Sequence, residues 1–281
     1  MDAPTAGVLR DIALLIWVVL AVGAFAYRWV RMSRPALAWN WGGNVSARGF
    51  ALPDAVVVLG IGLLMTSGFA GSVEPTAPQA PRQLTFEVLV VNAAFQLILC
   101  AVLLFYLVVM RGLQPMDLFG LRRQGFLRSL GMAVAFIVPT WAVVGIVAQL
   151  VSQWLKLFWP DQTAQVLVEA FRNTTTPSVR ILVIFAAVVI APLVEEIVFR
   201  GFVYGVVKRY TDGYFAALTS ALLFALIHGH VGSLVPLTVL ALIFCLAYEI
   251  TGTLLVPMCM HALFNAASLA ALMLYEKGAG G

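Results

Sequence analysis

Two adjacent acids inside a hydrophobic run are the residues of this chain that most clearly suggest chemistry. Glu195 and Glu196 follow an uncharged stretch, 183–194, and Arg200 lies four residues after Glu196. A carboxylate near the centre of a membrane helix costs about 3 kcal/mol on insertion scales, so intramembrane acids usually mark a function. On a helix Glu196 and Arg200 are one turn apart and can pair, whereas Glu195 is rotated by about 100°. We therefore expect Glu195 to face a site.

The alternative for these charges is a solvated helix end at the membrane surface. However, the sequence after Arg200 is apolar again over 201–207, and the next charges are Lys208 and Arg209. The two acids are therefore predicted to lie nearer the middle of a long helix than its end.

Polar residues also interrupt two later apolar segments. Phe224 and His228 are one turn apart in the first, and His261 and Asn265 are one turn apart in the second. Taken alone, such residues are typical of helix packing in membranes. Counted at about 1.5 Å per residue from the proposed cytosolic helix ends, these residues and Glu195 lie at depths of about 12–22 Å. The similar depths favour one shared cavity.

These groups could hydrolyse an acyl bond without a covalent nucleophile. Glu195 and a neutral His228 could hold and deprotonate a water molecule. His261 and Asn265 could offer N–H donors to the oxyanion that forms when water attacks a carbonyl. The alternative uses Glu195, His228 and His261 as ligands of a zinc ion with an open position for water, and zinc is the cofactor that these residues suggest.

Other signatures of hydrolases do not occur in the sequence. It has no H-E-x-x-H helix and no G-x-S-x-G turn, and no aspartate lies deep in a predicted span. His230 and Glu249 lie nearer the ends of predicted spans, so we expect them to be interfacial rather than catalytic. The cysteines show no metal-ligand spacing.

Composition predicts an all-α, polytopic membrane bundle. Hydrophobic residues make up 62% of the 281 residues and charged residues 11%, far below the ~25% charged of a soluble domain. A spanning helix needs about 20 mostly apolar residues, and about eight segments qualify. They are 12–30, 54–73, 88–110, 129–151, 178–200, 213–231, 233–251 and 253–275. The second and sixth are the weakest, and the first is expected to be a retained anchor rather than a cleaved signal peptide.

The chain divides into two predicted parts. Residues 1–177 hold four spans and an interfacial segment with Trp154, Trp159 and a helical pattern over 163–172. Residues 178–275 hold the other four spans and nearly all the intramembrane polar groups. This second part is the expected catalytic core.

Basic residues in the loops predict the orientation. The loops after the first, third and fifth spans hold 11 basic residues, and the opposite side holds six. The positive-inside rule then places both termini outside and the candidate site toward the cytosol. A plasma (inner) membrane location is expected, and the modest net charge of +4 gives no reason to expect a nucleic-acid partner.

The polar motifs together resemble a known family. Glu195-Glu196-x-x-x-Arg200, Phe224-x-x-x-His228 and His261-x-x-x-Asn265 are similar to the signature motifs of the CAAX prenyl endopeptidase and bacteriocin-processing family, also called the Abi family. The resemblance covers about 178–275.

The resemblance implies an eight-helix intramembrane peptidase. Glu195 and His228 would activate the water, and His261 and Asn265 would form the oxyanion hole. Glu196, Arg200 and Phe224 would support them. The substrate would be a peptide or a membrane-anchored protein, including prenylated ones. A non-catalytic membrane scaffold or immunity protein and a proton-coupled transporter are the competing hypotheses.

Overall fold

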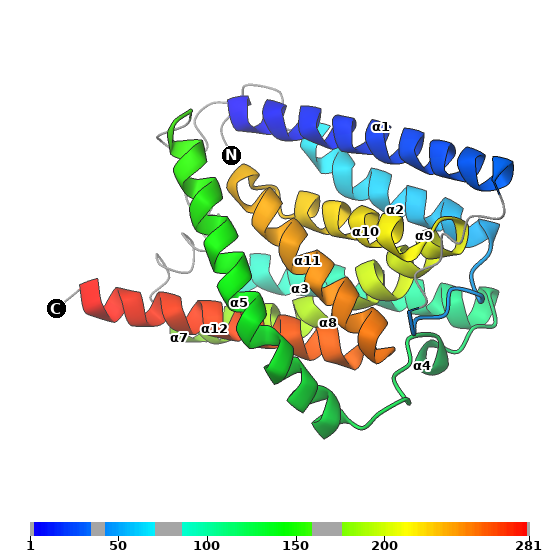
Figure 1. The fold of residues 1–281 in the computed structure, drawn as a ribbon. Helices are drawn as coiled ribbons and strands as arrows, with labels where there is room; N and C mark the ends of the chain where they lie inside the picture. Colours follow the sequence, from blue (N-terminus) through cyan, green and yellow to red (C-terminus); the bar gives the residue numbers. More distant parts are fainter. Residues whose placement is uncertain (1–2, 35–42, 71–85, 159–175, 280–281) are drawn as a thin grey trace.

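The protein is a bundle of helices in a computed structural model that describes residues 3–34, 43–70, 86–158 and 176–279 (Figure 1). Within these residues the structure contains helices and no strands, as the sequence predicted.

Several helices continue one into the next through π-helical turns, labelled η. The order is α1 (Ala3–Ser33), α2 (Leu52–Ala70), α3 (Phe86–Phe105), η2 (Tyr106–Met110), α4 (Pro115–Leu118), α5 (Phe126–Lys156), α7 (Pro177–Phe185), η3 (Ala186–Ile190), α8 (Ala191–Glu195), η4 (Glu196–Val203), α9 (Tyr204–Tyr210), α10 (Gly213–Ile227), α11 (Val231–Thr251) and α12 (Leu255–Ala279).

Six helices of the described part are long and apolar enough to cross a membrane. They are Gly7–Ser33, Phe86–Met110, Phe126–Lys156, Pro177–Tyr210, Val231–Thr251 and Leu255–Leu274. The membrane-helix prediction is thus confirmed, but the count of eight is not. The sixth predicted span corresponds to a shorter apolar helix, Gly213–Ile227, and the second to α2, of which Leu52–Leu64 is an apolar stretch. Of the expected interfacial segment, Trp159 and 163–172 lie outside the described residues.

The sixth predicted span, 213–231, extends too far. Helix α10 ends at Ile227, and His228 is its C-cap. Gly229 follows with a φ of +61°, a left-handed conformation that glycine adopts without steric cost and that commonly ends helices. His230 is then the N-cap of α11. His228 therefore lies in the turn between two helices rather than inside a span.

The central helix runs without a break from Pro177 to Tyr210 and contains both acids near its middle. The predicted span ended at residue 200, so the helix is about ten residues longer. Every residue of η4, including Glu196, is buried. The prediction that the acids lie within a long helix is confirmed.

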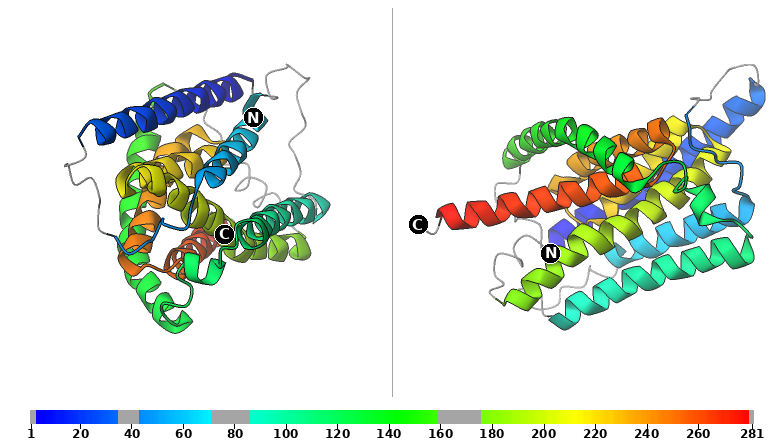
Figure 2. Two further views of the ribbon diagram at one scale, coloured as in Figure 1. Left: turned by 90° about the vertical axis from the view of Figure 1, so that its right-hand side faces the viewer. Right: turned by 90° about the horizontal axis from the view of Figure 1, so that it is seen from below.

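The other helices surround this central one. Helices α10 and α11 pack on η4, and α12 packs on η3 and α8. Seen from below, α3 and α12 flank the central helix on opposite sides (Figure 2). Helix α5 runs obliquely across α11 and α12 (Figure 1).

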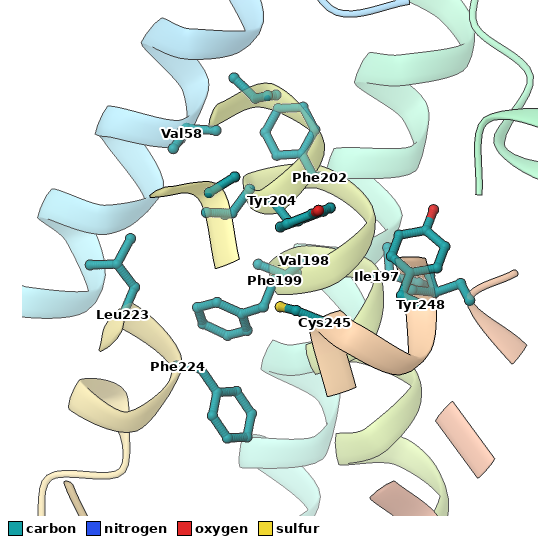
Figure 3. Close-up of a cluster of buried hydrophobic side chains, with 14 of the residues drawn as sticks. Val58, Ile197, Val198, Phe199, Phe202, Tyr204, Leu223, Phe224, Cys245 and Tyr248 are labelled. Atoms are coloured by element: carbon teal, nitrogen blue, oxygen red, sulfur yellow. The ribbon is translucent and has the colours of Figure 1, made fainter. Parts of the chain in front are cut away.

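Aromatic side chains fill the space between η4, α10 and α11. Phe199 and Phe224 meet edge to face with ring centroids 5.5 Å apart, and Cys245 and Tyr248 approach from α11 (Figure 3). All four are almost completely buried. This packed layer holds η4 against α10 and α11.

The predicted basic loops meet at one end of the bundle. Arg31 donates a hydrogen bond to the Thr211 carbonyl (2.7 Å), and Arg123 donates to the Asn44 carbonyl (2.8 Å). These bonds bring the three loops together, and which side of a membrane they face stays a prediction.

Glu249 lies at this same end, where its carboxylate is buried rather than solvated. It accepts hydrogen bonds from the Tyr204 hydroxyl and the Lys208 ammonium, and from the Val45 amide at 3.2 Å. Glu249 lies near the end of α11, where it was expected, and only 1% of it is exposed. Its network joins the ends of α9 and α11 to the loop before α2.

Candidate active site

A buried ion pair forms the centre of the candidate site. Arg200 Nη1 donates to Glu196 Oε1 at 2.8 Å, and both side chains are completely buried. The one-turn spacing predicted this pair. Removing one partner of such a pair leaves an uncompensated buried charge, which typically costs about 3–5 kcal/mol.

Two aromatic rings hold the guanidinium of Arg200 in place. Its Cζ atom lies 4.3 Å from the centre of the Phe224 ring and 5.3 Å from that of Phe244, distances at which cation–π attraction operates. We expected Phe224 to be a supporting residue, but nothing in the sequence distinguishes Phe244 from the other apolar residues of its span.

His261 connects the two acids across the helix interface. Its Nδ1 atom lies 2.9 Å from Glu196 Oε1, and its Nε2 atom lies 3.7 Å from Glu195 Oε2. The Glu195 side chain is 17% exposed, whereas that of Glu196 is fully buried. The two adjacent acids therefore have different environments, as their helical offset predicted.

His228 lies beside this cluster without bonding to it. Its Nδ1 atom is 2.8 Å from the carbonyl oxygen of Phe224, and its ring lies 4.8 Å from the Phe224 ring. Phe224 also contacts His261, at 5.7 Å between ring centroids. Within the described chain no hydrogen bond or ion pair joins His228 to Glu195. His228 is an exposed residue at the helix end.

Asn265 lies one turn beyond His261 and bonds to the central helix. Its Nδ2 atom donates to the Ala187 carbonyl at 2.8 Å. In η3 the Ala191 amide bonds to the carbonyl of Ala186, five residues back. The corresponding partner for Ala187 would be residue 192, which is a proline and has no N–H. The Asn265 side chain thus satisfies a carbonyl that Pro192 leaves without a helical partner.

The side chains do not form a metal centre in this arrangement. Among the described residues, no three or more His, Cys, Asp or Glu side chains are grouped so that they could hold an ion. His228 Nδ1 bonds to a backbone carbonyl, and within the described chain no hydrogen bond or ion pair joins His228 to Glu195 or His261. The arrangement of Glu195, His228 and His261 therefore does not fit the zinc alternative.

The fold and the polar centre together define an integral membrane protein that carries ionisable groups inside its helix bundle. Residues 177–267 match the family described as "Type II CAAX prenyl endopeptidase Rce1-like". This segment contains all the motif residues, so the family resemblance predicted from them is confirmed over about a third of the chain.

A curated relative supports the same class. The chain is 24% identical over 152 residues to "Putative membrane peptidase YdiL" of Bacillus subtilis (strain 168). The similar region covers 51% of this chain and 58% of the relative. No solved structure matches the chain. The comparisons support a membrane protein of a protease family.

Proposed function

We propose that this protein is an intramembrane endopeptidase that hydrolyses peptide bonds with a water molecule activated by Glu195 and His228. His261 and Asn265 stabilise the oxyanion, and Glu196, Arg200 and Phe224 support them. The observation that carries the proposal is the 3.7 Å approach of Glu195 Oε2 to His261 Nε2, inside the segment that matches the peptidase family.

Each residue has a chemical task in this reaction. Glu195 is the partly exposed acid, so it can reach a water molecule and take its proton. The water oxygen then bonds to the peptide carbon, and the proton passes to the leaving nitrogen when the carbon–nitrogen bond breaks. The His228 Nδ1 atom faces a carbonyl and therefore carries the hydrogen, which leaves Nε2 as an acceptor for the same water.

Asn265 can donate one of its two amide N–H hydrogens to the oxyanion. One hydrogen of Nδ2 goes to the Ala187 carbonyl, and the second remains for a substrate oxygen. A preorganised donor of this kind is worth about 10²–10³ in rate.

The proposed substrates are peptides or membrane-anchored proteins, including prenylated C-terminal peptides. The bundle lies in the plasma membrane with both termini outside, and its basic loop end faces the cytosol. Substrates then enter from the cytosolic side.

Cleavage by the purified full chain in liposomes tests this proposal. Quenched fluorescent peptides with and without a C-terminal prenyl cysteine motif would be compared, with the product ends located by mass spectrometry. We expect cleavage of the prenylated set near the anchor, and activity that survives a metal chelator, because the donor set does not fit zinc. A protein that cleaves no member of either set would instead be a scaffold or an immunity protein, and loss of activity with the chelator would revive the metal mechanism.

A further inference from the structure

The contacts of Glu196 determine which nitrogen of His261 carries a hydrogen. Glu196 Oε1 accepts from Arg200 Nη1 at 2.8 Å and lies 2.9 Å from His261 Nδ1. The guanidinium is always protonated and forms a buried ion pair with this carboxylate. An ionised carboxylate only accepts hydrogen bonds, so the hydrogen of this contact must be on Nδ1. A neutral His261 then has a lone pair on Nε2.

That lone pair faces the other acid. His261 Nε2 lies 3.7 Å from Glu195 Oε2, and the Phe244 ring packs 5.4 Å from the imidazole. A neutral imidazole in this tautomer has no hydrogen on Nε2 for an oxyanion. It becomes a donor only after it has accepted a proton there.

We propose that Glu196 is a positioning residue that fixes His261 in the Nδ1–H tautomer, so that His261 enters the reaction as a proton acceptor beside Glu195. The tautomer is a property of the resting protein, and its use in catalysis rests on the proposed peptidase function. As the water oxygen bonds to the peptide carbon, Glu195 takes one proton of the water and passes it to Nε2 of His261. His261, now protonated on Nε2, donates to the oxyanion, and the proton passes to the leaving nitrogen when the carbon–nitrogen bond breaks.

The surroundings of Glu196 make the tautomer strongly determined. Both of its hydrogen bonds converge on one oxygen, and within the described chain Oε2 has no hydrogen-bond partner. Arg200 cannot move away easily, because Phe224 and Phe244 pack against its guanidinium. A carboxamide in place of Glu196 could present its NH₂ group to Nδ1, which favours the opposite tautomer.

Nitrogen NMR of the full chain tests the tautomer directly. The protein has three histidines, so ¹⁵N-histidine labelling gives three imidazole spin systems, and His230→Gln and His228→Gln identify two of them. We expect the proton of neutral His261 on Nδ1 in the wild type and on Nε2 in Glu196→Gln. Glu249→Gln is the matched control, because Glu249 is also a buried, ion-paired glutamate; it should leave the His261 signals unchanged. A wild-type His261 protonated on Nε2 would overturn the proposal, whatever the variants do.

Peptide cleavage separates this proposal from the proposed function. Loss of the correct histidine tautomer in a hydrolase lowers kcat by about 10⁴, so Glu196→Gln should lose between about 10² and 10⁴ in kcat with little change in KM. An active protein with the Nε2–H tautomer would contradict the positioning role alone. An Nδ1–H tautomer in a protein that cleaves nothing would contradict the peptidase function alone.

Discussion

Glu195 and Glu196 are neighbours in the sequence, but the structure gives them different environments. Glu196 is fully buried between Arg200 and His261, and Glu195 is partly exposed on the next face of the helix. Helical geometry predicted this separation. The bond between Glu196 and His261 could not be predicted, because it depends on how α12 packs against the central helix.

His228 provides a matched pair of variants at the residue scale. His228 and His230 are two residues apart, but only His228 contacts Phe224, and His230 bonds to Ser233 at 2.9 Å. We expect His228→Gln to lower kcat by about 10²–10⁴, the usual range for a general base, and His230→Gln to change it by less than about threefold. Equal losses in both variants would mean that the turn, rather than the imidazole of His228, matters.

At the scale of elements, Pro192 explains why the central helix departs from regular α geometry at η3. Proline removes a donor from the helix interior, and π-helical turns flank it at η3 and η4. Such turns are frequent at functional sites. The proline can be read from the sequence. That it leaves the Ala187 carbonyl without a helical partner, and that Asn265 bonds to this carbonyl, can be seen only in the folded structure.

A double-mutant cycle tests this link between proline and asparagine. Asn265→Ala leaves the Ala187 carbonyl without its partner and should destabilise the protein by about 1–3 kcal/mol. In a Pro192→Ala background the restored N–H can bond to that carbonyl, so the same change should cost about 1 kcal/mol less. Thermal unfolding in one detergent measures the stability of the wild type, the two single variants and the double variant. Strictly additive costs would show that Pro192 does not expose the carbonyl that Asn265 binds.

Helix ends were the least predictable elements. Gly229 in His228-Gly229-His230 is a signal for a helix end. The predicted span nevertheless extended to residue 231, because the segment is apolar up to that point. The turn instead places His228 at a helix end, next to the polar cluster but without a bond to Glu195. The depth count predicted a shared cavity, but it could not give the contacts between the side chains.

At the scale of the whole molecule, the sequence predicted the class better than the span count. Low charge and apolar runs required a helical membrane bundle, and six helices meet the length and composition for spanning. The sixth predicted span became the shorter helix Gly213–Ile227, because Gly229 ends it early. Composition cannot identify packing partners such as Phe244, because every span is rich in apolar residues.

The ends of the bundle are held by charges outside the candidate site. Asp54 is fully buried and bonds to Arg111 Nε at 2.9 Å and to the Tyr106 hydroxyl at 2.8 Å. Glu249 ties α9 and α11 to the loop before α2 at the same end. These networks hold the loop side in place, so a variant of Glu249 is a fair test of general damage to the fold.

Cleavage by Glu195→Gln in proteoliposomes, beside Glu249→Gln, tests the central claim most directly. Glutamine keeps the size of the side chain but cannot take the proton of water. The account predicts that Glu195→Gln, folded as judged by its unfolding temperature, loses peptide cleavage by at least about 10³, whereas Glu249→Gln stays within about tenfold of the wild type. Full activity in Glu195→Gln would contradict the assignment of the base and with it the proposed site.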